Sequence, residues 1–157
     1  MGPFLSAVHV QKVIGPLLCD VNANRIILVA RSMPIVQAWS LEGDSLWRSA
    51  LAEFEQVMFT VDEQRTLRPV PPSELGDRIA RSVVSLDSST VLAQYEVWPG
   101  GAQTFSSIES RAFDVRTGHE LARTTLLPTL DALSGELAYS RHNQPFPQVV
   151  VLKRRRN

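Results

Sequence analysis

Three loop-like stretches rich in proline, glycine and serine carry most of the side chains with chemical reach in this sequence. They are RSMP (31–34), VWPGGAQTF (97–105) and SRHNQPFP (140–147). Trp98 precedes Pro-Gly-Gly, and an exposed aromatic side chain in such a loop points to a ligand or protein contact. The candidate ligand-binding residues in these stretches are Arg31, Trp98, Arg141, His142 and Asn143. We therefore predict recognition of a protein or a small molecule.

Covalent chemistry has little support in the residue pattern. The chain has no glycine-rich phosphate loop, no Gly-x-Ser-x-Gly elbow and no Cys or His pair at metal-ligand spacing. His142 lies beside Arg141 and has the chemistry of a general base, but hydrogen bonding within a proline-rich loop explains this stretch better. The sequence predicts no catalytic residue, no metal and no cofactor.

A repeated pattern indicates which elements position these loops. The stretch AWSLEGDSLWRSAL (38–51) returns as AFDVRTGHELARTTL (112–126), with Trp39 over Phe113 and Gly43 over Gly118. Each copy reads as an alternating strand, a turn with glycine and a second strand, which is typical of a β-hairpin. Upstream, LLCDVNANRIILVARS (17–32) and SVVSLDSSTVLAQYEV (82–97) repeat an apolar run, a polar turn and a β-branched strand.

A third copy begins with LDALSGELAYSRHN (130–143) and continues with QVVVLKRRR (148–156). The unit is a meander of four antiparallel strands with a period of about forty residues, which is typical of β-propeller blades. We therefore predict one all-β domain, 1–157, made of three blade repeats. Its predicted parts are an orphan outer strand at 1–11, a blade at 12–51, an insertion at 52–80, a blade at 81–127 and a three-stranded blade at 128–157.

The insertion at 52–80 contains Pro69, Pro71, Pro72 and Gly76, which exclude a continuous helix. Its alternating residues predict an added hairpin that turns near Asp62 to Arg65. On the same face as the candidate loops, this segment is either a lid or docking arm, or a strand pair that extends the blade packing.

The strand count leads to a prediction about assembly. GPFLSAVHV (2–10) matches the outer strand that the last repeat lacks, and a propeller typically needs at least four blades to close. We expect half of a six-bladed ring, in which two copies associate and each N-terminal strand completes the last blade of the other copy. A missing propeller half in another chain, an open half-ring and a fragment without independent function remain alternatives.

The chain resembles the C-terminal half of bacterial six-bladed β-propellers of the NHL-like kind. The resemblance is carried by DALSGELAYSRHNQPFPQVVVLKR (131–154), SVVSLDSSTVLAQYEV (82–97) and SRAFDVRTGHELART (110–124), and it covers most of residues 12–153. It implies a fold and little chemistry, because that group carries no catalytic motif in these stretches. Members of the group are usually exported, but this chain opens without a signal-peptide pattern, so the compartment stays open.

Two repeated positions have more than one interpretation. Asp20, Asp87 and Asp131 recur near the first strand of each unit, and an acidic ring on the axis would suit a calcium-dependent propeller hydrolase or lyase whose site forms only in the complete ring. We expect Asp87 and Asp131 instead to bond the backbone at the turn into the second strand. Residues 39, 113 and 150 share one register position and are predicted to pack between blades.

Bulk properties exclude two classes of partner. Lys and Arg number 16, as do Asp and Glu, so no net field attracts nucleic acid or an acidic membrane. No apolar run is long enough to cross a membrane. The apolar neighbours of Cys19 predict a buried, inert thiol.

Overall fold

The computed structural model is all-β over the residues that it describes, which are 15–20, 24–53, 59–61, 63–64, 67–69, 77–98, 106–142 and 146–153. Within these ranges there is no helix, and the strands form three antiparallel sheets of 4, 4 and 3 strands with one separate pair. The predicted all-β class and this grouping into sheets are confirmed. The outer strand predicted at 1–11 lies outside the described residues.

The first two sheets are four-stranded meanders. The first sheet contains β1 (Leu17–Asp20), β2 (Arg25–Val29), β3 (Ile35–Ser40) and β4 (Ser45–Ala50) in the order β1-β2-β3-β4. The second contains β7 (Asp77–Ser85), β8 (Thr90–Trp98), β9 (Ser107–Asp114) and β10 (Glu120–Thr124) in the order β7-β8-β9-β10. The loops between neighbouring strands match the turns expected from the repeat.

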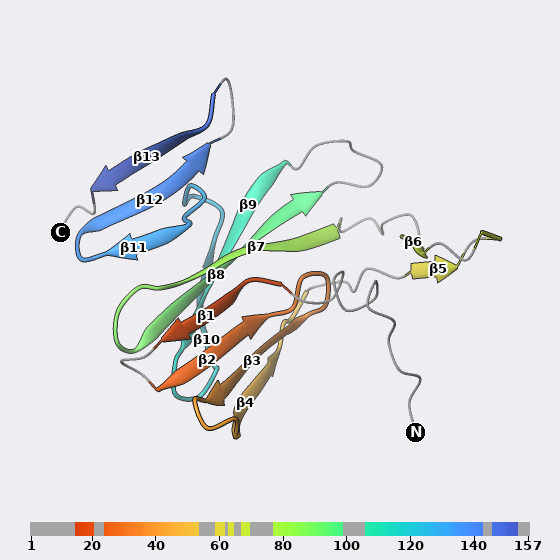
Figure 1. Ribbon diagram of the computed structural model, residues 1–157, viewed down its shortest axis with the longest axis horizontal. Helices are drawn as coiled ribbons and strands as arrows, with labels where there is room; N and C mark the ends of the chain where they lie inside the picture. The colour runs from red at the N-terminus through yellow and green to blue at the C-terminus, as the bar shows by residue number, and fades with distance from the viewer. Residues whose placement is uncertain are drawn as a thin grey trace.

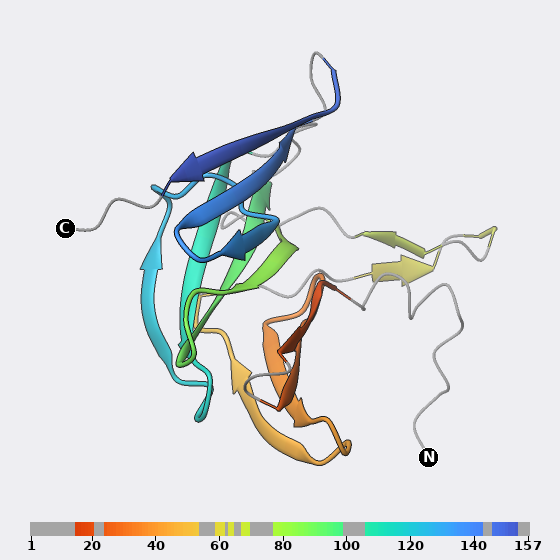
Figure 2. The ribbon, with the colours of Figure 1, turned by 60° about the vertical axis from the view of Figure 1, so that its left-hand side comes forward.

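The third sheet contains β11 (Ala132–Ser134), β12 (Leu137–His142) and β13 (Gln148–Lys153), so one long edge of β13 has no partner strand among the described residues. The segment between the first two sheets holds the antiparallel pair β5 (Phe59–Val61) and β6 (Leu67–Pro69). In Figures 1 and 2 the three large sheets follow one another, and β5 and β6 project to one side of them.

The second sheet lies between the other two and is covered on both faces. Its Val91, Ala93 and Phe113 share one buried cluster with Ile27 and Ala38 of the first sheet. Side chains of the opposite parity belong to a second cluster, in which Val84, Leu92 and Leu130 are buried and the partly buried Leu133, Ala138 and Leu152 pack against them. Because neighbouring residues of a strand point to opposite faces, these two clusters account for the nearly continuous burial of β8 and β9.

Polar contacts fix the first sheet against the second. The indole Nε1 of Trp47 donates to the backbone oxygen of Val115 at 2.9 Å, and the guanidinium of Arg25 donates to the same oxygen. Gly118 turns the β9–β10 hairpin with a φ of 71°, and a Cβ there would lie 2.3 Å from Cε3 of Trp47. Glycine is therefore required at this turn both for its backbone conformation and for the close approach of the two sheets.

The structure corrects the sequence interpretation at three places. Cys19 is exposed, not buried, because it lies on the outer face of the first sheet. Trp39 is only half-buried on that same face, whereas Phe113 at the equivalent position is fully buried. Asp131 lies before β11 and accepts a hydrogen bond from the backbone N–H of Arg141 at 2.6 Å, so it does not sit at the turn into β12.

Candidate functional site

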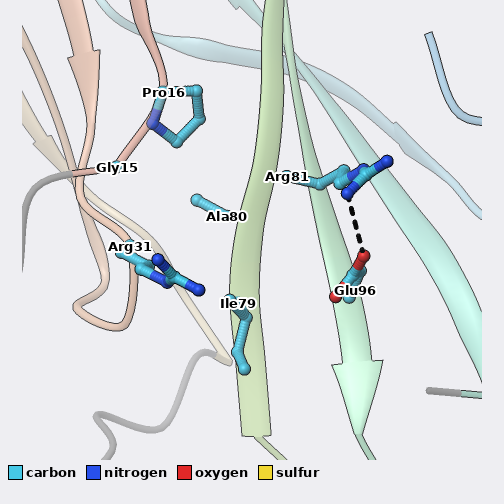
Figure 3. Close-up of a pocket in the computed structure, with 7 residues that line it drawn as sticks. All are labelled: Gly15, Pro16, Arg31, Ile79, Ala80, Arg81 and Glu96. Atoms are coloured by element: carbon cyan, nitrogen blue, oxygen red, sulfur yellow. Dashed lines mark ion pairs between the residues drawn. The ribbon is translucent and has the colours of Figure 1, made fainter. Parts of the chain in front are cut away.

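A cavity of about 370 Å³ opens between the first and second sheets, at the strand ends where β2 leads into the 31–34 loop. Figure 3 shows its two walls. Gly15, Pro16 and Arg31 belong to the first sheet side, and Ile79, Ala80, Arg81 and Glu96 belong to β7 and β8. A cavity of this volume is large enough for a small organic molecule.

Backbone contacts define the floor of this cleft. The N–H of Ala80 donates to the carbonyl of Arg31 at 2.7 Å, and the N–H of Val29 donates to the carbonyl of Pro16 at 3.1 Å. A Cβ on Gly15 would lie 2.0 Å from the carbonyl oxygen of Val29. Glycine is thus the residue that lets the segment before β1 run close enough to β2 to form one wall.

A β-bulge aims a second cation at the cleft. The pairing of β7 with β8 shifts between Ala80 and Ser82, which leaves Arg81 as the extra residue. Bulges re-aim side chains at the ends of strands. The Nη1 atom of Arg81 lies 3.7 Å from Oε1 of Glu96, and both side chains remain partly exposed. A pair this long and this exposed contributes little binding energy, so Arg81 remains available to a ligand.

Of the residues that the sequence analysis selected, Arg31 lines the cleft, and Trp98 contacts one of its lining residues, Glu96. Arg31 lines it directly, and no side-chain partner of its guanidinium is found among the described residues. Trp98, at the end of β8, donates from Nε1 to Oε2 of Glu96 at 3.3 Å. The guanidinium of Arg31 and the Arg81–Glu96 pair thus both line the cavity, and Trp98 is connected to it only through Glu96.

The other sequence candidates lie elsewhere. Arg141 and His142 are exposed at the end of β12 in the third sheet and do not line the cleft. His142 has Nε2 at 3.1 Å from Oγ of Ser140, which is the local hydrogen bonding expected of this stretch. Asn143 lies outside the described residues. The sequence analysis missed Arg81 and Glu96, which lie on strands where their charges read as ordinary solvent-facing positions.

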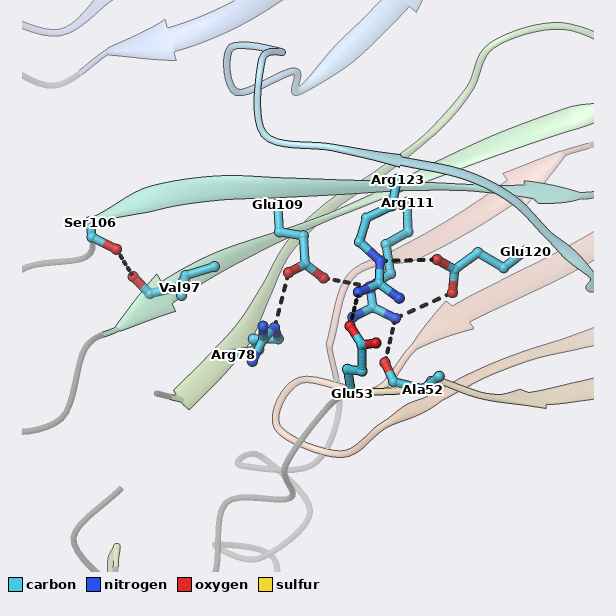
Figure 4. Close-up of polar contacts among 9 residues, drawn as sticks. All are labelled: Ala52, Glu53, Arg78, Val97, Ser106, Glu109, Arg111, Glu120 and Arg123. Carbon is cyan, nitrogen blue, oxygen red and sulfur yellow. Dashed lines mark hydrogen bonds and ion pairs between the residues drawn. The ribbon is translucent and has the colours of Figure 1, made fainter. Parts of the chain in front are cut away.

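A second group of charges, shown in Figure 4, surrounds the fully buried Arg111. Its Nε lies 2.5 Å from Oε1 of Glu109, and its Nη1 lies 3.2 Å from Oε2 of Glu120 and 2.9 Å from the carbonyl oxygen of Ala52. Arg78 holds the other carboxylate oxygen of Glu109 at 3.1 Å. The network therefore ties the end of the first sheet to the middle of the second.

Electrostatics assign this network a structural role. Burial acts to raise the pKa of Glu109, but hydrogen bonds and charge from Arg111 and Arg78 outweigh it and hold that pKa below its usual value. The hydrogen bonds that Arg123 donates to Glu53 and Glu120, at the edge of the same group, raise the pKa of Arg123. Groups held so firmly in their charged forms are poorly suited to exchange protons near neutral pH.

In the described parts of the chain, no three His, Cys, Asp or Glu side chains gather in a way that could hold a metal ion. Asp87 serves its turn, because its Oδ1 accepts from the N–H and the hydroxyl of Ser89, and these bonds lower its pKa. No helix of these parts has the length and apolar character needed to cross a bilayer. A hydrolase or lyase with an axial metal stays an untested alternative.

No protein-family model, no curated protein and no solved structure matches the chain. The resemblance to NHL-like propellers accordingly stays a prediction, and the functional argument depends on the residues of the cleft.

Proposed function

We propose that the chain is a non-catalytic recognition scaffold of the β-propeller type, three blades of a six-bladed ring, which binds a small organic carboxylate in the cleft beside Arg31. The proposal on architecture is supported by three consecutive antiparallel sheets and by burial of the middle sheet on both faces. Relation to the NHL-like propellers is part of this proposal and is supported by the blade pattern alone.

The observation that carries the binding proposal is the guanidinium of Arg31, which lines the cavity without a described partner. A guanidinium presents a planar fork of donors that matches the two oxygens of a carboxylate. Arg81 adds a second cation to the lining, and among the described lining residues the one carboxylate, that of Glu96, opposes the two. The cleft thus carries a net positive charge that favours an anion.

The remaining wall argues for an organic anion over a bare inorganic one. Pro16, Ile79 and Ala80 present apolar surface to the cavity. Contact with these residues would remove apolar ligand surface from water, while the carboxylate pairs with Arg31. Glu96 offers an acceptor for a donor group on the same ligand.

The test is an NMR titration of the ¹⁵N-labelled protein with benzoate, with benzamide as the uncharged probe of the same shape. We expect benzoate to shift the amides of Arg31, Ala80 and Glu96, and benzamide to shift them far less. Arg31→Gln should weaken benzoate binding at least tenfold, a loss of about 1.4 kcal/mol.

Arg116→Gln is the matched control, because Arg116 is exposed in the β9–β10 turn and does not line the cavity. This variant should bind benzoate as the wild type does. Equal shifts with both probes, or equal affinity in Arg31→Gln and the wild type, would overturn the proposal.

A further inference from the structure

Each end of the stack of sheets leaves one apolar face uncovered in the described parts of the chain. On the first sheet, Leu17 is 60% exposed, Cys19 is exposed, and Ile26, Leu28 and Trp39 are half-buried. On the third sheet, Val149 is 64% exposed, Val151 is 54% exposed, and Tyr139 is half-buried. Contiguous exposed apolar surface of this kind marks a contact site.

The register shows what the face of the first sheet corresponds to. Cys19, Ile26 and Trp39 lie opposite one another across β1, β2 and β3. Ser85, Val91 and Phe113 lie opposite one another in the same way across β7, β8 and β9. The repeat that places Trp39 over Phe113 superposes these two rows.

The two rows have different surroundings. Val91 and Phe113 are fully buried against the first sheet, whereas Ile26 and Trp39 are half-buried. The position two residues earlier on the first strand shows the same contrast. Leu17 of the first sheet corresponds to Val83 of the second, which is only 8% exposed. The uncovered face of the first sheet is therefore the same face that the second sheet presents to a preceding sheet.

The uncovered face of the third sheet is the opposite one. Ala138 and Leu152 pair across β12 and β13 and pack against the second sheet. Val149 and Val151 have the other parity. In the repeat, these two valines are on the same face as Ala38, which the first sheet packs against the second. In each earlier repeat, the following sheet covers this face.

We propose that two copies of this chain pair through these end faces, the Val149–Val151 face of each copy packing on the Leu17–Trp39 face of the other. The argument for a second copy is continuity, since the same kind of face-to-face contact already joins the first sheet to the second and the second to the third. Two such contacts give six sheets, within the range of four to eight at which propellers close, and a closed two-fold arrangement leaves neither face exposed. The proposal rests on the six-bladed ring of the proposed function and does not depend on carboxylate binding beside Arg31.

The experiment is light scattering behind a sizing column over a range of concentrations. We expect the wild type at twice the 17.5 kDa mass of one chain, and both Leu17→Asp and Val151→Asp at the mass of one chain. Because these side chains are more than half exposed in the single chain, the substitutions should leave the fold intact, which circular dichroism checks. Val149→Asp provides a second variant on the third sheet.

Leu121→Asp is the matched control, because Leu121 is 55% exposed but lies on β10 of the middle sheet. This variant should associate as the wild type does. The thiol of Cys19 gives a second readout: its reaction with a thiol reagent should be at least fivefold slower in the wild-type pair than in the two monomeric variants.

A mixture of Leu17→Asp and Val151→Asp distinguishes this arrangement from others. One of the two interfaces in the mixed pair then contains no aspartate, so the mixture should form pairs although neither variant does so alone. A wild type of single-chain mass at every concentration would overturn the proposal. Three other results would also overturn it: open-ended assemblies larger than a pair, loss of pairing in the variants of one face but not of the other, and a mixture of the two variants that stays monomeric.

Discussion

Gln94 is the side chain whose replacement most directly tests how the middle sheet is joined to the third. It is fully buried, and all of its amide groups have partners. Its Nε2 donates to Oγ of Ser110 at 2.9 Å and to the carbonyl of Pro128 at 2.8 Å. Its Oε1 accepts from the N–H of Leu130 at 2.6 Å and from the hydroxyl of Ser82 at 3.1 Å.

Gln94→Leu keeps a similar volume and removes all four bonds. The two serine hydroxyls can rotate toward other acceptors, but the backbone groups of Pro128 and Leu130 cannot move without displacing the linker to the third sheet. Two buried backbone groups left without partners cost about 1–3 kcal/mol each, and burial of the leucine returns roughly 1.5–2 kcal/mol. The difference of these ranges runs from about 0 to 4.5 kcal/mol, and its centre predicts a net loss of about 2 kcal/mol in the free energy of unfolding.

Urea unfolding followed by tryptophan fluorescence measures this loss, with the slope against urea as a check that the same surface is exposed. Gln94→Glu is the nearly isosteric comparison: a carboxylate keeps the acceptor for Leu130 but loses the donor to Pro128. Burial would raise the pKa of this carboxyl in the folded chain, so the variant should be most stable below the pKa of the unfolded chain and lose stability as the pH rises through the folded pKa. A loss below roughly 0.5 kcal/mol for Gln94→Leu, within the range of ordinary surface substitutions, would refute the reasoning.

Two further predictions concern the β9–β10 turn. Gly118→Ala should destabilise the fold by about 1–3 kcal/mol more than Gly43→Ala, because both glycines have a positive φ but only a Cβ at 118 meets Trp47, whereas one at 43 meets nothing within 4 Å; equal losses in urea unfolding would show that the contact is unimportant. Hydrogen bonds from the backbone and side chain of Thr117 lower the pKa of Asp114, so its carboxylate contributes stability above the pKa of the unfolded chain and that stability is lost as the pH falls through the lower folded pKa. Asp114→Asn should flatten the fall of the melting temperature on acidification, and parallel curves for variant and wild type would contradict this.

Local signals explain why the strands and turns were accessible from sequence. The alternation and glycine of residues 38–51 correspond to β3 and β4, and the same pattern at 112–126 corresponds to β9 and β10. Turn residues and alternating polarity act over a few positions, so a single sequence is enough to find them. The start of β7 at Asp77 was missed because residues 77–80 are in a strand only through their pairing with the end of β8.

The residues of the candidate site also divide into those that local sequence signals reveal and those that depend on strand pairing. Arg31 was found because it stands in a loop with a distinctive composition, and Trp98 because it adjoins one at the end of β8. Arg81 reaches the cleft through a one-residue shift in the pairing of β7 with β8, and such a shift depends on the partner strand, not on the residues around Arg81. Glu96 becomes informative only when Arg81 and Trp98 are seen to meet at its two oxygens.

Cys19 and Trp39 show where local reasoning about burial fails and what the failure implies. An apolar pattern indicates that a face is suited to a contact, but the number of sheets around it determines whether the contact is made within one chain. Phe113 and Trp39 occupy the same register position, and only Phe113 has a preceding sheet against it. If the outer face of the first sheet were exposed to water in the functional protein, polar residues could occupy it without any loss of core packing. Leu17, Ile26 and Trp39 stand there instead, which is the composition expected of an interface, and the proposed pairing of the two end faces accounts for it without any residue that the chain does not already contain.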